Sequence, residues 1–360
     1  MRLISPLLKH AVYPGLAKTG YLRRRNGAGP AVVTYHGVMP RGYRMIDPNL
    51  DGSLVAAVSL RRQLSLLKDQ YNVISPQQFL QWCRCKQELP PRSVLLTCDD
   101  GLRNTLTEML PILQEMELSC LFFITGASLS EAASMLWYEE LYLMFLAAPE
   151  TLTLEMPEIG APVRAAGQEA KRALWSRLLK KLSMYDGSCR RGILEQIRQQ
   201  LGFCEGWNTR YLQDTAKSRR FLMLNAGELQ SLAAAGMSIG AHTLSHPMLS
   251  QSGEGSCWSE ISESRRRLEQ ALGQPVWALA YPFGDPASVT RRELEMAERA
   301  GYQCAFLNVG GGFGAETPRF AWPRVHVTGE MSLAEFEAHV SGFYRWVRKR
   351  LLREELGIAS

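Results

Sequence analysis

The chain has 360 residues, of which 46% are hydrophobic and 21% are charged, and its formal net charge is +6. This composition is typical of a folded globular enzyme and excludes disordered and fibrous proteins. No stretch approaches the roughly 20 consecutive apolar residues of a membrane-spanning helix, and we expect no nucleic-acid partner.

Basic residues gather at both ends of the chain. No acidic residue precedes the run Arg23 to Arg25, and five basic residues crowd the other end, namely Arg345, Arg348, Lys349, Arg350 and Arg353. Basic ends indicate contact with an anionic surface such as a membrane, although solubilising termini would have the same composition. The opening 20 residues lack a long apolar segment and a cleavage site for export. We therefore expect a cytoplasmic protein, either free in the cytoplasm or peripheral to the inner face of the membrane.

Short apolar runs alternate with helical patterns from Ala31 onward. The runs that predict strands are AVVTYHGV at 31–38, NVIS at 72–75, SVLLTCDD at 93–100, SCLFFIT at 119–125, MSIGAHT at 237–243, VWALAYPFG at 276–284 and YQCAFLN at 302–308. Strands that are linked by helices need crossover connections, and these produce a mainly parallel sheet. About seven such units favour an α/β fold of the irregular (β/α)7-8 barrel type.

The alternation is interrupted between residues 127 and 222. Here LWYEELYLMFLAAPE, KRALWSRLLKKLSMYD and CRRGILEQIRQQLGF predict amphipathic helices, with one strand, TLTLEM, among them. Insertions in barrels usually emerge from the face that carries the site, so we expect a cap that shapes substrate binding. Additional packing without a functional role is the alternative. We therefore predict that the chain is divided into a basic segment 1–30, a first barrel part 31–126, the insertion 127–222, a second barrel part 223–340 and a basic helix 341–360.

Two adjacent carboxylates, Asp99 and Asp100, end the apolar run VLLTC. Two buried like charges are costly unless a cation or a proton lies between them. The segment GAHTLSHPM supplies His242 and His246 directly after another predicted strand, and one helical turn would bring both imidazoles to one side. Two imidazoles and one carboxylate form a facial set of metal ligands with open positions. One aspartate would then bind the metal, the other would handle protons, and Gly101 would permit the tight turn.

These residues resemble the polysaccharide deacetylases, which are also called the NodB-homology domain or carbohydrate esterase family 4. TCDDG at 97–101 is similar to the family's TFDDG motif, and HTLSH at 242–246 is similar to its HSxxH motif. The resemblance extends from about Ala31 to Val327, outside the insertion. It implies that Asp99 is the general base and that Asp100, His242 and His246 hold one divalent metal, Zn²⁺ or alternatively Co²⁺ or Ni²⁺.

The family's third motif resembles YPFG, which comprises Tyr281, Pro282, Phe283 and Gly284. The resemblance implies that this segment forms a wall of the groove and that the Phe283 N–H stabilises the oxyanion. A turn without this function is the alternative. The arginine that often precedes the motif is missing, and Arg324 could replace it beside the base. We expect Tyr281 and Trp322 to stack on sugar rings, and Trp137 to do so only if the insertion folds over the site.

The general acid should be a histidine that protonates the leaving amine. The family usually supplies it from a late LxH motif, which no late strand of this chain shows cleanly. TYHG at 34–37 resembles that motif at the start of the chain, as in circularly permuted members, and this predicts His36 as the acid. His326 is the alternative.

The predicted function is hydrolysis of an N-acetyl or N-formyl group from an amino sugar in a polysaccharide, a glycolipid or a sugar precursor. Metal-bound water would attack the acyl carbonyl while Asp99 accepts its proton and His36 protonates the amine. The basic ends are compatible with a lipid-linked sugar at the membrane. The alternatives are an inactive glycan-binding protein of the same fold and a non-haem iron oxygenase, against which the second aspartate argues.

Overall fold

The structure, a computed structural model, describes residues 4–25, 29–85, 87–126, 129, 134–160, 162–309 and 317–351. The predicted start of the insertion at residue 127 and the last nine residues of the predicted C-terminal helix lie outside this part of the chain.

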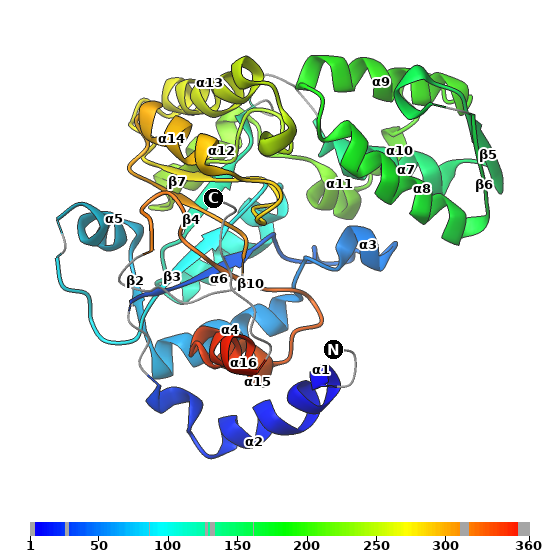
Figure 1. Ribbon diagram of the computed structural model, residues 1–360. Coiled ribbons are helices and arrows are strands. Elements are labelled where there is room, and N and C mark those ends of the chain that lie inside the picture. The colour runs from blue at the N-terminus through cyan, green and yellow to red at the C-terminus, as the bar shows by residue number, and fades with distance from the viewer. Residues whose placement is uncertain are drawn as a thin grey trace.

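A parallel sheet of eight strands forms the centre of the protein (Figure 1). Its strands are β1 (Ala31–Tyr35), β2 (Asn72–Ile74), β3 (Ser93–Cys98), β4 (Leu121–Ile124), β7 (Ser238–Ala241), β8 (Ala278–Ala280), β9 (Cys304–Phe306) and β10 (Val325–His326). The order is β10-β1-β3-β4-β7-β8-β9, and β2 pairs with the start of β3. Trp322 bridges to Phe306 of β9, and three residues later β10 pairs with β1, so this segment contacts both edges of the curled sheet. The predicted α/β barrel fold is confirmed.

The two faces of the sheet are both apolar, because side chains alternate between them along each strand. In β3, Val94, Leu96 and Cys98 pack toward the surrounding helices, whereas Leu95 points into the interior of the barrel. Such strands are buried on both sides, which explains why they are nearly continuous apolar runs in the sequence.

Helices surround this sheet (Figure 1). Those of the barrel region are α3 (Pro48–Asp51), α4 (Ala57–Gln70), α5 (Pro76–Cys85), α6 (Leu110–Glu115), α12 (Ala226–Ala234), α13 (Glu254–Leu272), α14 (Arg291–Arg299) and α15 (Leu333–Val340). Asn225 and Thr290 begin α12 and α14 as N-caps, each with a glutamate three residues later that completes a capping box.

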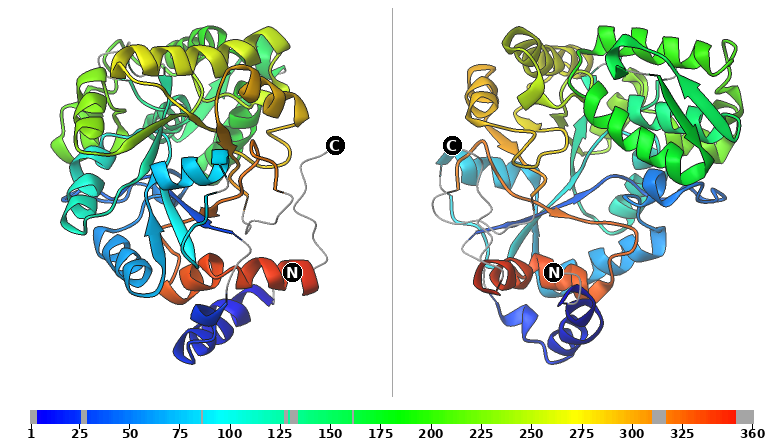
Figure 2. Two further views of the ribbon diagram at one scale, coloured as in Figure 1. Left: turned by 90° about the vertical axis from the view of Figure 1, so that its left-hand side faces the viewer. Right: turned by 45° about the vertical axis from the view of Figure 1, so that its right-hand side comes forward.

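A separate lobe projects from the barrel between β4 and β7 (Figure 2). It contains α7 (Trp137–Ala147), the antiparallel pair β5 (Thr151–Leu154) and β6 (Val163–Ala166), α8 (Gly167–Leu182), α9 (Gly187–Gln200), α10 (Thr209–Leu212) and α11 (Thr215–Phe221). The lobe has its own apolar cluster, built from α7, α8, α9 and the small sheet. Antiparallel bridges from Met135 to Leu222 and from Leu102 to Met223 form its neck.

The first and last described helices pack together on the side of the barrel away from the lobe (Figures 1 and 2). There α1 (Ile4–Leu7) and α2 (Tyr13–Lys18) lie beside α15 and α16 (Phe343–Leu351), and Tyr13, Leu22, Phe343 and Val347 form their shared core. Within the described residues, no helix combines the length and the apolar character that crossing a membrane requires.

Candidate active site

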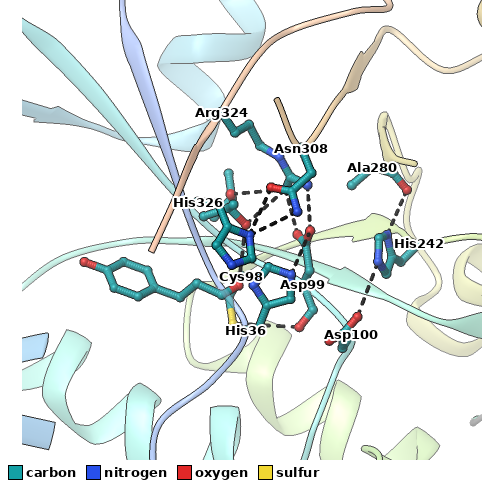
Figure 3. A network of polar contacts seen from close by, with 12 residues as sticks. His36, Cys98, Asp99, Asp100, His242, Ala280, Asn308, Arg324 and His326 are labelled. Atoms are coloured by element: carbon teal, nitrogen blue, oxygen red, sulfur yellow. Dashed lines mark hydrogen bonds and ion pairs between the residues drawn. The ribbon is translucent and has the colours of Figure 1, made fainter. Parts of the chain in front are cut away.

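The predicted site residues follow strands that run in the same direction. His36 follows β1, Asp99 and Asp100 follow β3, His242 follows β7, and His326 ends β10. The C-terminal ends of parallel strands meet at one edge of a barrel, and that edge carries the active sites of barrel enzymes. Figure 3 shows these side chains converging on one place.

The two aspartates diverge because the backbone turns sharply between them. The Asp99 N–H still donates to the Tyr35 carbonyl at 2.9 Å and so continues the sheet, whereas Asp100 has a φ of +74° and Gly101 a φ of +76°. A Cβ atom at Gly101 would lie 3.0 Å from the Cδ1 of Ile124. Glycine therefore permits the turn for two reasons, its conformational freedom and its lack of a side chain. The expected tight turn is present, and it aims Asp99 and Asp100 at different partners.

Asp99 forms a buried, bidentate ion pair with Arg324. The Nη1–Oδ1 distance is 2.7 Å and the Nη2–Oδ2 distance is 2.6 Å. Arg324 is 0% exposed and Asp99 is 1% exposed. Arg324 also donates to the Leu307 carbonyl and lies over the ring of Phe123. Although burial opposes ionisation, the charge of Arg324 lowers the pKa of Asp99. Asp99 is thus held as a carboxylate in a fixed orientation.

Asp100 faces His242 and His246. Its Oδ1 lies 3.4 Å from the Nε2 of His242 and 3.6 Å from the Nε2 of His246. The Nδ1 of His242 lies 2.8 Å from the Ala280 carbonyl; donation there leaves Nε2 free as a ligand atom. One ligand atom from each of the three buried residues lies within 4.8 Å of the others. This donor set fits a divalent cation.

The histidines are not brought together by a helical turn, so that expectation was wrong. His242 directly follows β7, and the connection to His246 is an irregular loop in which Thr243 and His246 have φ values of +60° and +57°. Thr243 Oγ1 accepts a hydrogen bond from the His246 N–H at 3.1 Å and closes this loop. A spacing of four residues also suits such a loop, which periodicity alone cannot distinguish from a helix.

The electrostatics of the cluster favour a positive charge beside Asp100. Burial opposes ionisation of Asp100, yet its hydrogen bond with His242 and the neighbouring histidines lower its pKa. Burial also opposes protonation of His242, whose hydrogen bond with Asp100 nevertheless raises its pKa. Burial and the charge of His242 lower the pKa of His246 to about 3. His246 is therefore a neutral imidazole, which is the form that binds metals.

Comparisons with known proteins agree with this geometry. The family model for polysaccharide deacetylases matches residues 204–305. The Bacillus subtilis (strain 168) protein YxkH, which is named as a polysaccharide deacetylase, is 26% identical over 117 residues. That match covers 32% of this chain and 41% of YxkH, so the chain spans about two fifths of that relative.

Two solved structures share the fold over most of the chain. The deacetylase PplD of Streptococcus pyogenes, in complex with acetate, has a TM-score of 0.55 and 16% identity, and the match covers 87% of this chain and 99% of that one. IcaB of Ammonifex degensii has a TM-score of 0.53 and 16% identity, and the match covers 88% of this chain and 98% of that one. The family predicted from the sequence motifs is confirmed for the matched region, whereas circular permutation stays a prediction.

His36 and His326, the two predicted candidates for the general acid, lie side by side. Their ring centroids are 4.6 Å apart, and the His36 Nε2 lies 4.0 Å from the Asp99 Oδ2. The Nδ1 of His326 contacts the side-chain amide of Asn308, and burial and the charge of His36 lower the pKa of His326 to about 3. His326 is therefore neutral at physiological pH, whereas the role of His36 as the acid stays a prediction.

The YPFG segment lies at the end of β8, and Phe283 contacts His246 with ring centroids 5.1 Å apart. Phe283 has a φ of +61°, and Gly284 approaches Asn308 so closely that a Cβ atom would lie 2.3 Å from the Asn308 nitrogen. Tyr281 is fully buried and donates to the Phe320 carbonyl. The strained turn lies beside the cluster, whereas the role of the Phe283 N–H stays a prediction.

Two predicted stacking residues need correction. Tyr281 is 0% exposed and Trp322 is 5% exposed, and Trp322 packs against Phe79 and Trp82 in the barrel interior. Neither ring offers a free face to a sugar. Arg324, by contrast, lies beside the predicted base, where it was expected, because its guanidinium is fully buried against Asp99. Aromatic residues near a motif are more often core than binding surface, and burial cannot be read from sequence.

The sequence did not indicate several residues that support the site. Asn104 accepts from the Val38 N–H and holds the turn after His36, and Asn308 contacts His326. Glu260 of α13 accepts from the N–H groups of Leu244 and Ser245 in the histidine loop. Asn104 follows the TCDDG motif closely enough to be suspected, but no signal singled out the other two.

Proposed function

We propose that this protein is a metal-dependent hydrolase that removes an N-acetyl group, or alternatively an N-formyl group, from an amino sugar of a glycan. The observation that supports this most directly is that two adjacent aspartates face different partners. Asp100 faces two histidines, whereas Asp99 is paired with Arg324. The family match and the relatives named as deacetylases support the same reaction class.

Asp100, His242 and His246 would hold the cation, which we propose to be Zn²⁺, with Co²⁺ and Ni²⁺ as alternatives. A divalent cation supplies Lewis acidity, which polarises an acyl carbonyl and lowers the pKa of water.

The chain's own residues would then move the protons. Asp99 accepts a proton from the attacking water, and Arg324 keeps its carboxylate ionised and correctly oriented beforehand. The N–H of Phe283 stabilises the negative charge that develops on the carbonyl oxygen. His36, whose Nε2 lies 4.0 Å from the Oδ2 of Asp99, gives a proton to the leaving nitrogen. The amide C–N bond breaks, and acetate and a free amine are released.

The lobe supports a substrate longer than one sugar. A cavity of about 270 Å³ beside His246 is lined by Ser245 from the barrel and by lobe residues that include Trp137, Arg191 and Asn208. This volume is close to the lower limit of ligand pockets, ~300 Å³, and its mixed walls suit a carbohydrate. We propose that it accepts the sugar next to the one that carries the acyl group.

The variant Asn208→Trp tests this part of the proposal, because it places a large ring in the cavity. We expect kcat/KM to fall for N-acetylated oligosaccharides and to stay unchanged for a single N-acetylated sugar. Gln199→Trp, on the exposed side of α9, is the matched control. Equal losses on both substrates would remove the cavity from substrate recognition.

Release of acetate or formate tests the reaction itself. The substrates are N-acylated hexosamine glycolipids, nucleotide sugars and oligosaccharides, offered to the protein before and after chelation. We expect one class to release its acyl group, chelation to stop this, and Zn²⁺, Co²⁺ or Ni²⁺ to restore it. Tight glycan binding without hydrolysis under any metal would indicate the inactive binding protein. Oxygen-dependent turnover that needs reduced iron would indicate the oxygenase.

A lipid-linked substrate at the cytoplasmic face of the membrane would explain the basic ends, and we include it in the proposal. The surface formed by α1, α2 and α16 exposes 61% of Leu7, 44% of Tyr21 and 42% of Trp346. Arg25 lies beside the ring of Trp346, and the first 25 residues carry no acidic group. Apolar side chains framed by basic ones are typical of proteins that bind anionic membranes. All eight cysteines are unpaired, which fits a reducing compartment.

Vesicle flotation tests this membrane contact. We expect binding to vesicles that contain phosphatidylserine, weaker binding to phosphatidylcholine alone, and a loss of binding in Trp346→Ala. Trp258→Ala changes an exposed tryptophan on α13 and serves as the control. Equal binding to both vesicle types would contradict the electrostatic part of the proposal.

A further inference from the structure

The loop that carries His246 has a backbone that is unfavourable by itself. Thr243 and His246 have φ values of +60° and +57°, although neither is glycine. Each such residue costs on the order of 1 kcal/mol and persists only where its surroundings hold it in place. The contacts that hold this loop therefore determine where the imidazole of His246 lies.

The inserted lobe supplies a large share of these contacts. Arg190 of α9 is 2% exposed, and its Nη2 donates to both the carbonyl and the Oγ of Ser245 at 2.7 Å. Its Nη1 lies 3.5 Å from the His246 carbonyl. Trp137 of α7 donates its indole N–H to that same carbonyl at 3.2 Å. Two helices of the lobe thus bind the backbone of the residue that faces Asp100.

The lobe and the loop are also in close steric contact. The guanidinium of Arg190 lies 4.5 Å from the centre of the Trp137 ring, so each side chain fixes the other. A Cβ atom at Gly187 would lie 2.9 Å from the side chain of Ser245, and glycine lets the start of α9 approach this closely. The Met248 N–H donates to the carbonyl of Ser183 in the lobe.

The barrel holds the loop from its other side. Glu260 accepts from the N–H groups of Leu244 and Ser245 at 2.9 and 2.7 Å and from the Ser245 hydroxyl at 2.5 Å. The Ser245 hydroxyl therefore lies between the Glu260 carboxylate and the Arg190 guanidinium. The loop is thus held between a carboxylate of the barrel and a guanidinium of the lobe.

We propose that the inserted lobe is a structural part of the metal site, with Arg190 as a positioning residue that fixes His246 through the backbone of Ser245 and His246. The proposal rests on the metal-binding role of Asp100, His242 and His246 given above. Coupling of this kind is reciprocal: a docked lobe strengthens metal binding, and bound metal stabilises the docked lobe. The cavity beside His246 lies at the same junction, so a glycan held there contacts the parts that set the histidine's position.

Metal affinity of the purified full chain tests the proposal without reference to turnover. Arg190→Met keeps the length of the side chain and removes its donors. Because residues that orient metal ligands typically change affinity by about 10–100-fold, we expect a loss of Zn²⁺ affinity in this range by calorimetric titration of metal-stripped protein. Arg198→Met makes the same change on α9, where Arg198 pairs with Glu195, and should stay within about twofold of wild type.

Two further readouts keep the result clear if Arg190→Met folds poorly. Trp137→Phe removes only the indole N–H that reaches His246, and we expect a smaller loss of Zn²⁺ affinity in a chain that melts like wild type. Amide hydrogen exchange should show that Zn²⁺ slows exchange at 183–194 in wild type and no longer does so in Arg190→Lys, which keeps the charge without the paired donors.

Folded Arg190→Met and Trp137→Phe proteins with wild-type Zn²⁺ affinity would overturn the coupling and leave the proposed reaction intact. A wild-type protein that binds no Zn²⁺, Co²⁺ or Ni²⁺ would instead overturn the metal site, and this inference with it.

Discussion

The buried pair of Arg324 and Asp99 gives the sharpest prediction for a single substitution. Arg324→Met fills a similar volume but leaves the Asp99 carboxylate buried without its bidentate partner. It also removes the hydrogen bond to the Leu307 carbonyl. Removing one member of a buried ion pair typically costs about 3–5 kcal/mol. Both groups are almost inaccessible to water, so we expect the free energy of unfolding at pH 7 to fall by this amount.

The same substitution should impair turnover. Asp99 loses both bonds that fix its carboxylate, and misplacement of a reacting group by about 1 Å typically costs on the order of 100-fold in rate. We therefore expect kcat to fall about 100-fold while Zn²⁺ affinity changes little, because Arg324 does not contact the metal cluster.

Urea denaturation of metal-stripped protein measures the change in the free energy of unfolding. The double variant Asp99→Asn/Arg324→Met should recover part of the loss, because no charge is then left buried alone. Arg319→Met makes the same change at an exposed position five residues earlier and should stay within about 0.5 kcal/mol of wild type. A loss below about 1 kcal/mol in Arg324→Met, or wild-type kcat, would refute this reasoning.

Three further predictions concern the acid, the turn and a histidine far from the site. His36→Gln should lower kcat by about 10²–10⁴-fold and His326→Gln by far less, because His326 is already neutral; the reverse order would exchange their roles. Gly101→Ala should lower Tm, because its φ is +76° and the added methyl group would meet Ile124; an unchanged Tm would contradict this. Burial lowers the pKa of His339 from 6.5 to about 4, so wild type should lose stability as pH falls between these values. His339→Phe keeps the stacking on Tyr344 and should not show this loss, which at about 1.4 kcal/mol per pKa unit amounts to no more than ~3.5 kcal/mol. Parallel pH profiles of wild type and variant in urea would exclude it.

The sequence was sufficient to predict the barrel and the three residues that converge at the candidate metal site. Both depend on local patterns: buried strands are apolar runs, Asp100 and His242 lie within two residues of the ends of such runs, and His246 lies four residues after His242. The same strand ends carry His36 and Asp99, and parallel strands bring their ends together whatever the lengths of the connections.

Features that depend on packing could not be predicted in the same way. The spacing of His242 and His246 suggested a helical turn, but the structure has a loop with two positive φ values that the lobe and Glu260 hold in place. Tyr281 packs among the residues between the sheet and its helices, and Trp322 packs in the barrel interior, which a motif does not reveal. Arg190 lies 56 residues before His246, and no local pattern indicates their contact.

Asp100 is proposed to bind the metal and Asp99 to accept the proton, and one paired measurement tests this difference most directly. Zn²⁺ affinity and acyl release are measured side by side for Asp99→Asn and Asp100→Asn. We predict that Asp99→Asn binds Zn²⁺ like wild type and releases no acetate, whereas Asp100→Asn loses Zn²⁺ affinity and activity together. An active Asp99→Asn protein, or an Asp100→Asn protein that keeps its metal and its turnover, would contradict the account.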